Sequence, residues 1–247
     1  MFELSQSTPK SIQTGFPITQ SVVNGSQGGA VYQFNDNYFV IHKSGFCSLI
    51  QKSSCLDELI LFFQNDRVPQ YFHIYDIDED LLNRVQKETD LFNLRIRKRI
   101  QLVYMSDELV KPPTISGFSC ELINETSIDA LNVFNLSLDS RYWDSRTDFI
   151  NFANGVEVFD QNKLPVSICY AAAIADRKAE IDVFTDPRNR GLGLARLAVG
   201  KFINSCIAKK IIPNWDCFVD NTASLNTAES FGFSRIKAYI FLSLFKK

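Results

Sequence analysis

The sequence predicts an α/β (α+β) protein of two domains, and three observations support that prediction. The 247 residues suit one large domain or two small ones, and hydrophobic residues, at 45%, suffice for a core. Strand-like and helix-like periodicities alternate along the chain. A strand, a turn and a helix follow one another over residues 179–195, and the rest of the chain is organised around this junction.

The first predicted domain, residues 1–113, reads as a small α/β layer. Its first 25 residues are rich in Ser, Thr and Gln, which favours partial order at best. A hairpin is expected from Ala30, because Asn and Asp at 35–37 tolerate the left-handed conformations of a tight turn. Its other predicted elements are strands over 45–50, 70–75 and 97–105 and helices over 55–64 and 78–89. His42 and His73 lie in strand patterns and are interpreted as structural.

A domain boundary is predicted at Lys111–Thr114, where two consecutive prolines lack N–H donors and stiffen a linker. The second domain is then 114–247. Its predicted elements are strands over 118–123, 155–159, 165–174, 179–185 and 213–219, helices over 127–136, through Phe149 and Phe152, from Leu194 and from Thr222, and a last strand. The 21 phenylalanines are spread along the chain and are interpreted as core.

At the junction, Pro187 ends the strand, and helical periodicity begins at Leu194. Gly191 and Gly193 therefore lie at the first turn of a helix. A helix N-terminus carries unpaired N–H groups and a partial positive charge, and glycine lets a ligand approach the bare backbone. The pattern predicts an anion site. The alternative is that the glycines only make a tight connection.

The spacing separates the families that use this device. A P-loop ends in Gly-Lys-Ser/Thr, whereas this loop continues Gly193-Leu194-Ala195. A dinucleotide fingerprint has a small residue three positions after its second glycine, where this chain has Arg196. A nucleotide-binding domain is therefore the weakest of the readings.

The segment Arg190–Ala195 resembles the Arg/Gln-x-x-Gly-x-Gly/Ala motif of GNAT-type N-acetyltransferases. Downstream, a strand at 213–219, Asn221-Thr-Ala-Ser224 and Gly232-Phe233 follow in the order and spacing of that superfamily. The resemblance covers about 118–247 and is nearest to the zwittermicin-resistance-type subfamily. It implies a mixed central sheet of GNAT type flanked by helices, with a smaller N-terminal α/β domain packed beside it.

The resemblance implies direct transfer of an acetyl group from acetyl-CoA (coenzyme A) to an amine, in a small molecule or a peptide. A non-catalytic CoA-binding or interaction protein on the same fold is the alternative. The implied cofactor-binding residues are Val183, Phe184, Thr185, Arg190, Gly191, Leu192, Gly193, Leu194, Ala195, Asn221 and Ser224. Asn221 also has a purely structural interpretation, as the cap of the helix that follows.

The chemistry requires a proton acceptor, because an alkylamine with a pKa near 10.4 is protonated at pH 7. Glu180, Asp182 and Asp216 are the candidates. Glu180 and Asp182 share a strand face by alternation, unless a bulge inverts the parity. A backbone N–H near Val183 is the implied oxyanion donor. Where many relatives have a tyrosine that protonates the leaving thiolate, this chain has Ala228.

Arg141, Tyr142 and Trp143 are candidates for acceptor binding, because aromatic and charged residues together in a connection are unusual. The alternative is that Tyr142 and Trp143 only cover the core. For the first domain the resemblance leaves two roles: completing the acceptor pocket, or forming the surface of a possible homodimer.

Composition excludes several other classes of function. A net charge of −2 argues against nucleic-acid binding through bulk charge, and two histidines argue against a metal site. No apolar run approaches the roughly 20 residues that span a bilayer, and the N-terminus lacks signal-peptide features. We therefore expect a cytoplasmic protein whose six cysteines are reduced thiols.

Overall fold

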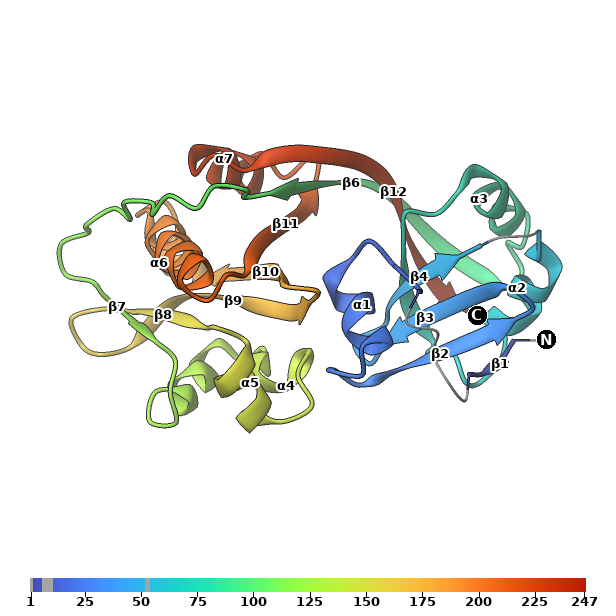
Figure 1. The fold of residues 1–247 in the computed structure, drawn as a ribbon, viewed down its shortest axis with the longest axis horizontal. Coiled ribbons are helices and arrows are strands. Elements are labelled where there is room, and N and C mark those ends of the chain that lie inside the picture. Colours follow the sequence, from blue (N-terminus) through green and yellow to red (C-terminus); the bar gives the residue numbers. More distant parts are fainter. Residues whose placement is uncertain (1, 6–10, 52–53) are drawn as a thin grey trace. The chain divides into compact units, whose positions relative to one another are not determined.

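The computed structural model of the protein describes residues 2–5, 11–51 and 54–247. The chain forms two compact units, which can be followed in Figure 1. Unit 1 consists of Met1–Ile100, Phe218–Asp220 and Lys237–Lys247, and unit 2 of Gln101–Cys217 and Asn221–Ile236. The boundary expected between residues 113 and 114 falls within unit 2. The units divide elsewhere because the long strands β6 (Phe92–Val103) and β12 (Ser234–Lys246) each contribute residues to both.

Unit 1 is built on a mainly antiparallel set of strands in the order β1-β2-β3-β4-β5-β12, in which only β4 and β5 are parallel. The predicted hairpin is confirmed, with Asn35 at φ 51° in its turn. The remaining elements of the unit are β1 (Glu3–Leu4), α1 (Pro17–Val23), β2 (Gly29–Phe34), β3 (Asn37–His42), β4 (Phe46–Ile50), α2 (Leu56–Phe63), β5 (Tyr71–Tyr75) and α3 (Glu79–Gln86).

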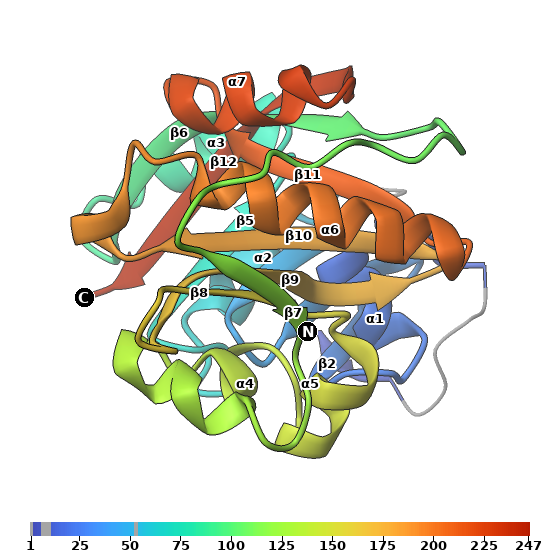
Figure 2. The same cartoon turned by 90° about the vertical axis from the view of Figure 1, so that its left-hand side faces the viewer.

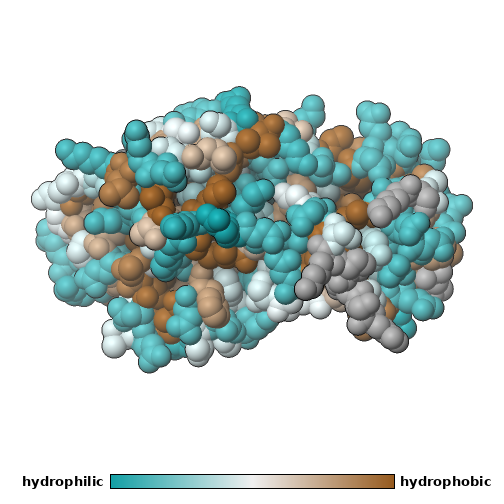
Figure 3. Space-filling view, in the orientation of Figure 1, coloured by the Kyte–Doolittle hydropathy of each residue, from teal (hydrophilic) through white to brown (hydrophobic). Residues whose placement is uncertain are grey.

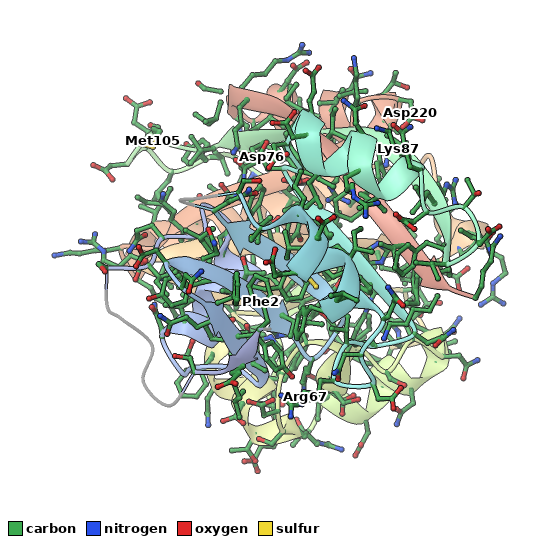
Figure 4. All side chains as sticks on the ribbon, turned by 90° about the vertical axis from the view of Figure 1, so that its right-hand side faces the viewer. Phe2, Arg67, Asp76, Lys87, Met105 and Asp220 are labelled. Carbon is green, nitrogen blue, oxygen red and sulfur yellow. The ribbon has the colours of Figure 1, made fainter. Side chains whose placement is uncertain are left out.

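Phenylalanine rings form much of the core of unit 1. Phe39 is fully buried, and the centroids of Phe62 and Phe63 each lie 5.5 Å from its own. Phe2 is 1% exposed and is labelled near the centre of the view in Figure 4, whereas Arg67 is labelled near its lower edge. Aromatic pairs at these separations stabilise beyond the area that they bury.

The expectation of partial order at best for the first 25 residues is wrong for residues 11–25, while residues 1 and 6–10 lie outside the described part. Pro17 occupies the first turn of α1, where its missing N–H has no cost. Thr19 and Ser21 are fully buried in α1. Their hydroxyls are satisfied, since that of Thr19 shares a 2.8 Å hydrogen bond with Ser48 and that of Ser21 donates to a carbonyl. Polar composition misled the prediction because these polar groups pair inside the fold.

Unit 2 carries a mixed sheet in the order β11-β10-β9-β8-β7, in which β10 and β11 are parallel and the other pairs antiparallel. Helix α6 covers one face of these strands, and η1, α4 and α5 lie on the other (Figures 1 and 2). The elements of unit 2 are β7 (Ser119–Leu122), the 3₁₀ helix η1 (Ile128–Phe134), α4 (Leu138–Arg141), α5 (Arg146–Phe152), β8 (Val156–Phe159), β9 (Pro165–Ala175), β10 (Lys178–Thr185), the 3₁₀ turn η2 (Pro187–Asn189), α6 (Leu194–Ala208), β11 (Ile212–Phe218) and α7 (Thr222–Ser230).

The predicted α-helix over 127–136 is instead the shorter 3₁₀ helix η1. Asn135 follows it in the left-handed conformation, at φ 52°, and ends it. Asparagine adopts this conformation more readily than most residues, so it terminates helices much as glycine does.

Within residues 2–5, 11–51 and 54–247, no helix is both long enough and apolar enough to cross a membrane. On the face shown in Figure 3, hydrophilic and hydrophobic side chains are interspersed.

Candidate functional site

The site begins where β10 and β11 separate. The two strands pair over only three residues of β10, Lys178–Glu180. On the other side of β10 the register with β9 shifts between Glu180 and Ile181, so that Ala172 of β9 is an extra residue. A bulge of this kind bends and twists a strand pair. The second half of β10 therefore runs beside β9 and diverges from β11.

A cavity of about 550 Å³ lies along this divergence. It is lined by parts of β10, the turn after it, the start of α6, β11 and the start of α7: Val183, Phe184, Thr185, Asn189, Arg190, Gly191, Gly193, Leu194, Ala195, Arg196, Trp215, Asn221, Ala223, Ser224 and Thr227. The lining includes every residue predicted to hold a cofactor except Leu192, whose side chain is 51% exposed. The structure thus brings two stretches about 30 residues apart in sequence to one cavity.

The backbone conformation of the turn before α6 favours glycine at two positions. Gly191 and Gly193 both have φ 81°, a conformation that side-chain-bearing residues rarely adopt. A Cβ atom at Gly191 would meet no other atom within 4 Å. The space beside the Gly191 backbone is therefore open.

Positive charge gathers at the same end of α6. Its N-cap residue, Gly193, has no side chain to accept from the first N–H groups, and its first turn holds no acidic residue. Arg190 and Arg196 line the cavity as well. Hydrogen bonds from Arg188 hold the pKa of Asp186 at about 2. Asp186 therefore stays ionised, and its negative charge is paired with the positive charge of Arg188. The arrangement favours an anionic ligand.

The start of α7 closes another side of the cavity. The side-chain oxygen of Asn221 accepts from the Ser224 N–H at 3.2 Å, so Asn221 caps the helix. The Ser224 hydroxyl accepts from the Trp215 indole at 3.0 Å and ties α7 to β11. Ala228 is fully buried, and Thr227 is the residue of the next helical turn that lines the cavity.

The three candidate carboxylates have different surroundings, and none is among the described residues that line the cavity. Glu180 is 4% exposed and accepts from the Asn214 amide at 2.9 Å. Asp216 is 9% exposed. The side chain of Asp182 is 31% exposed, and Asp182 directly precedes the cavity-lining Val183. The extra residue at the register shift is Ala172 of β9, so alternation along β10 is not interrupted and is consistent with a common face for Glu180 and Asp182.

A family model described as GNAT acetyltransferase matches residues 112–242. The chain belongs to this family. It is 27% identical over 255 residues to the uncharacterized N-acetyltransferase YdfB of Bacillus subtilis (strain 168), covering 96% of each chain.

Solved structures show the same GNAT fold. A GCN5-related N-acetyltransferase-like protein from Streptococcus suis 89/1591 has a TM-score of 0.72 at 20% identity, over 92% of both chains. A GNAT-family acetyltransferase from Novosphingobium aromaticivorans DSM 12444 has a TM-score of 0.60 at 17% identity, over 87% of this chain and 90% of its own. The predicted mixed central sheet flanked by helices is thereby confirmed.

The aromatic candidates for acceptor binding lie on the face of this GNAT sheet that α4 and α5 cover. Trp143 is 3% exposed and donates from its indole to the Ala171 carbonyl at 2.9 Å, so it packs in the core. Tyr142 is 5% exposed, with its ring 6.4 Å from that of Tyr170. Arg141 alone is half-exposed, and its guanidinium nitrogen Nη1 lies 3.9 Å from the Asp182 carboxylate.

Tyr170, on the neighbouring strand β9, forms a hydrogen bond with Asp182. Its side chain is fully buried, and its hydroxyl donates to Oδ2 of Asp182 at 2.7 Å. Burial, reinforced by the Asp182 charge, raises the pKa of Tyr170 well above its usual value near 10. The hydroxyl therefore remains a donor at neutral pH and fixes one oxygen of Asp182.

Thiol chemistry is disfavoured in this member of the GNAT family. Burial raises the pKa of Cys47, Cys55, Cys120, Cys169 and Cys206, to about 11 for Cys55 and Cys120 and about 12 for Cys206. A thiol with so high a pKa is a poor nucleophile at neutral pH. In the part of the chain that the structure describes, no three His, Cys, Asp or Glu side chains could together hold a metal ion.

Sequence reasoning missed five cavity-lining residues: Asn189, Arg196, Trp215, Ala223 and Thr227. Helical spacing could have found Thr227, which lies three residues after Ser224 on one helix face. Tyr170 carried no local signal, because it is distant in sequence and only strand pairing places it opposite Asp182.

Proposed function

We propose that the protein is an N-acetyltransferase that uses acetyl-CoA and transfers the acetyl group directly to an amine. The observation that supports this most is the cavity between the diverging strands β10 and β11, which ends at the uncapped N-terminus of α6. Acetyl-CoA, when bound, supplies an acetyl group activated as a thioester. A non-catalytic CoA-binding protein is the second candidate, and Ala228, in place of the usual tyrosine, favours it.

The residues present fit such a cofactor. The backbone of Arg190–Ala195 offers N–H groups to a pyrophosphate, the space at Gly191 is open, and Arg190 and Arg196 add positive charge. Val183, Phe184 and Thr185 lie on the part of β10 that diverges from β11, so this edge is not paired with β11 and can pair with an extended pantetheine arm. The Phe184 and Thr185 carbonyls also accept from the Ser167 hydroxyl and Arg190 Nε. In this proposal Asn221 and Ser224 shape the far wall, and Leu192 contributes only its backbone.

Asp182 is the best proton acceptor of the three carboxylates. Its side chain is the one that solvent and an acceptor reach, whereas Glu180 and Asp216 are nearly buried. Tyr170 holds Oδ2, which orients the carboxylate. The Val183 N–H is the proposed donor to the developing oxyanion, a contribution of about 3 kcal/mol in acyl-transfer enzymes. In the same proposal the thiolate, with a pKa near 8.5, departs without a tyrosine acid.

The finer assignments remain part of the proposal. Pro213–Cys217 and Asn221–Ser224 suggest a relationship to the zwittermicin-resistance-type subfamily. We propose a cytoplasmic location and an amine acceptor, without a role for nucleic acid, membrane or metal. For unit 1 we propose one of two roles: it completes the acceptor pocket, or it forms the surface of a homodimer.

The test is a matched pair of variants, Gly191→Asp and Gly191→Asn. Both residues tolerate the left-handed conformation and have nearly equal size, so they differ mainly in charge. Titration calorimetry with coenzyme A should show at least tenfold weaker binding for Gly191→Asp than for Gly191→Asn, because a carboxylate repels the phosphates. The difference should shrink with salt.

Equal affinities of the two variants would remove the anion site from the proposal. Turnover of acetyl-CoA with an amine panel, followed by release of free thiol, then separates the enzyme from the non-catalytic alternative. Binding without thiol release across the panel favours the second.

A further inference from the structure

Four residues on one face of the unit 2 sheet form a charged cluster over an aromatic floor. We call Arg141, Tyr142, Tyr170 and Asp182 the Arg141 cluster. Arg141 ends α4, Tyr142 follows it, and strands β9 and β10 place Tyr170 and Asp182 opposite each other. The two tyrosines are buried, while Arg141 is 48% and Asp182 31% exposed at the side chain. The charged groups thus lie side by side at the surface, on a rigid base.

Side chains of the described residues contact only one of the two oxygens of the Asp182 carboxylate. Tyr170 donates to Oδ2, and Arg141 lies nearest the same oxygen. No side chain in the described part of the chain donates to Oδ1. A carboxylate accepts at about four positions, so Oδ1 retains its capacity. Asp182 directly precedes Val183, which lines the cofactor cavity, so the carboxylate belongs to the part of β10 that borders the cavity.

Arg141 is held only loosely to Asp182. The separation of 3.9 Å between Nη1 and Oδ2 exceeds the 2.7–3.2 Å of an N–H···O hydrogen bond. The guanidinium lies 5.0 Å from the centre of the Tyr142 ring and also interacts with the Tyr142 side chain through a hydrogen bond, which uses one of its five donors. An exposed ion pair of this kind contributes about 0–1 kcal/mol, so a ligand separates it at little cost.

We propose, on the premise of the function above, that the acceptor is an α-amino acid, with its amine bound at Asp182 and its carboxylate at Arg141. The positive Arg141 and the negative Asp182 lie a few ångströms apart. They are therefore complementary to the carboxylate and the ammonium group of such a zwitterion. Arg141 makes planar, paired hydrogen bonds with carboxylates that lysine does not reproduce.

In the reaction, the amine nitrogen forms a bond to the acetyl carbon as the carbon–sulfur bond breaks. The ammonium loses two protons in all. Asp182 accepts one and releases it to solvent, and the other ends on the sulfur of coenzyme A. Arg141 takes no part in proton transfer, so it is a residue of specificity.

The test compares the twenty common α-amino acids with their α-carboxamides, which lack the negative charge. The amine pKa of an amide is also lower, about 8, so free amine is more abundant in the amides and a preference for the acids is the more stringent result. The wild-type protein should acetylate at least one amino acid with kcat/KM at least 100-fold above that of its amide. Arg141→Gln should abolish this preference, chiefly through a higher KM, and Arg141→Lys should retain part of it.

The matched control is Arg146→Gln, which removes another surface arginine of unit 2, paired with Asp129, and should leave the preference unchanged. The affinity for coenzyme A should be that of the wild type in all these variants. Equal rates for acids and amides would overturn the proposal. So would a protein that binds coenzyme A and acetylates no α-amino acid. Failure of the wild type to bind coenzyme A is a different result, which overturns the proposed function itself.

Discussion

Helices α6 and α7 both begin at the cavity of unit 2, yet their first N–H groups are treated differently. In α7, Asn221 accepts from the Ser224 N–H and satisfies one of them within the chain. In α6, Gly193 occupies the equivalent position with φ 81° and has no side chain to accept. A Ser, Thr, Asp or Asn cap stabilises a helix by only a few tenths of a kcal/mol relative to glycine. The 15-residue α6 therefore loses little stability by having Gly193 at this position, beside the cavity.

The difference indicates which end of the cavity is built for a ligand. In a capped helix start, an N–H donor is satisfied by the capping side chain, whereas in an uncapped start that donor can bind an anion. Arg190 and Arg196 lie at the uncapped start and add charge of the same sign. We therefore expect the start of α6 to contribute affinity for the ligand and the start of α7 to contribute shape.

The largest expected effect comes from a side chain at the uncapped start. Gly193→Val should weaken coenzyme A binding by roughly 1,000-fold, or about 4 kcal/mol, because the branched side chain blocks the backbone donors. Gly232→Val is the matched control. Gly232 also has positive φ, at 88°, beside a helix end, but it does not belong to the described lining of the cavity.

Both variants should lose a similar 1–2 kcal/mol of stability, the approximate cost of a left-handed conformation for a side-chain-bearing residue. Calorimetry and thermal unfolding measure the two effects separately. Equal affinities of the two variants for coenzyme A would contradict the comparison.

A buried group tests whether lack of a partner alone marks a ligand site. Glu157 on β8 is fully buried, and neither of its oxygens has a hydrogen-bond partner among the described residues. Burial raises its pKa from 4.5 to about 7, and the nearby Ser127 side chain opposes that shift only in part. The folded state therefore binds the proton more tightly than the unfolded state. This stabilisation is complete below pH 4.5 and is lost as the pH rises through 7.

Between pH 5 and 9, the wild type should therefore lose about 3 kcal/mol of stability that Glu157→Gln does not lose. Chemical denaturation across that range measures it, and the affinity for coenzyme A should match the wild type. A variant with the same pH dependence as the wild type would show that Glu157 is already ionised. Unlike the start of α6, Glu157 is fully buried and does not belong to the described lining of the cavity.

Cap removal from α7 has a smaller expected effect. Asn221→Ala should lower the free energy of unfolding by about 1 kcal/mol and coenzyme A affinity by less than tenfold, because its oxygen already accepts from Ser224. Ser145→Ala, which removes the cap of α5 where Ser145 accepts from the Asp148 N–H, is the control for stability alone. A loss of affinity above 100-fold would assign Asn221 to the ligand instead.

The sequence predicted much of unit 2, because its signals are local. Pro187 and the two glycines define a turn between a strand and a helix, and Gly232 follows α7 at φ 88°. The end of η1 depends on a single left-handed residue, Asn135, which periodicity does not detect. The buried α1 depends on side-chain partners elsewhere in the chain, such as Ser48 for Thr19.

The parts of the candidate site that are formed by residues adjacent in sequence were predictable. The parts that depend on strand pairing were not. Motif spacing located the residues of the α6 turn and the start of α7. The exposure of Asp182 relative to Glu180 depends on strand register and on Asn214 and Tyr170, which are distant in sequence. Ala228 follows Ser224 by one helical turn but is fully buried, so the substitution Ala228→Tyr would change core packing.

The smallest expected effect is that of Leu192→Ala, in the middle of the α6 turn. Leu192 is 51% exposed and is the one predicted cofactor residue outside the described lining, so its side chain should matter neither to the fold nor to the ligand. We expect stability within about 0.5 kcal/mol of the wild type and coenzyme A affinity within roughly twofold. Thermal unfolding and calorimetry on the same preparation measure both. An affinity loss of tenfold or more would mean that side chains carry recognition in this turn. The contrast between a backbone site at α6 and a side-chain cap at α7 would then be lost.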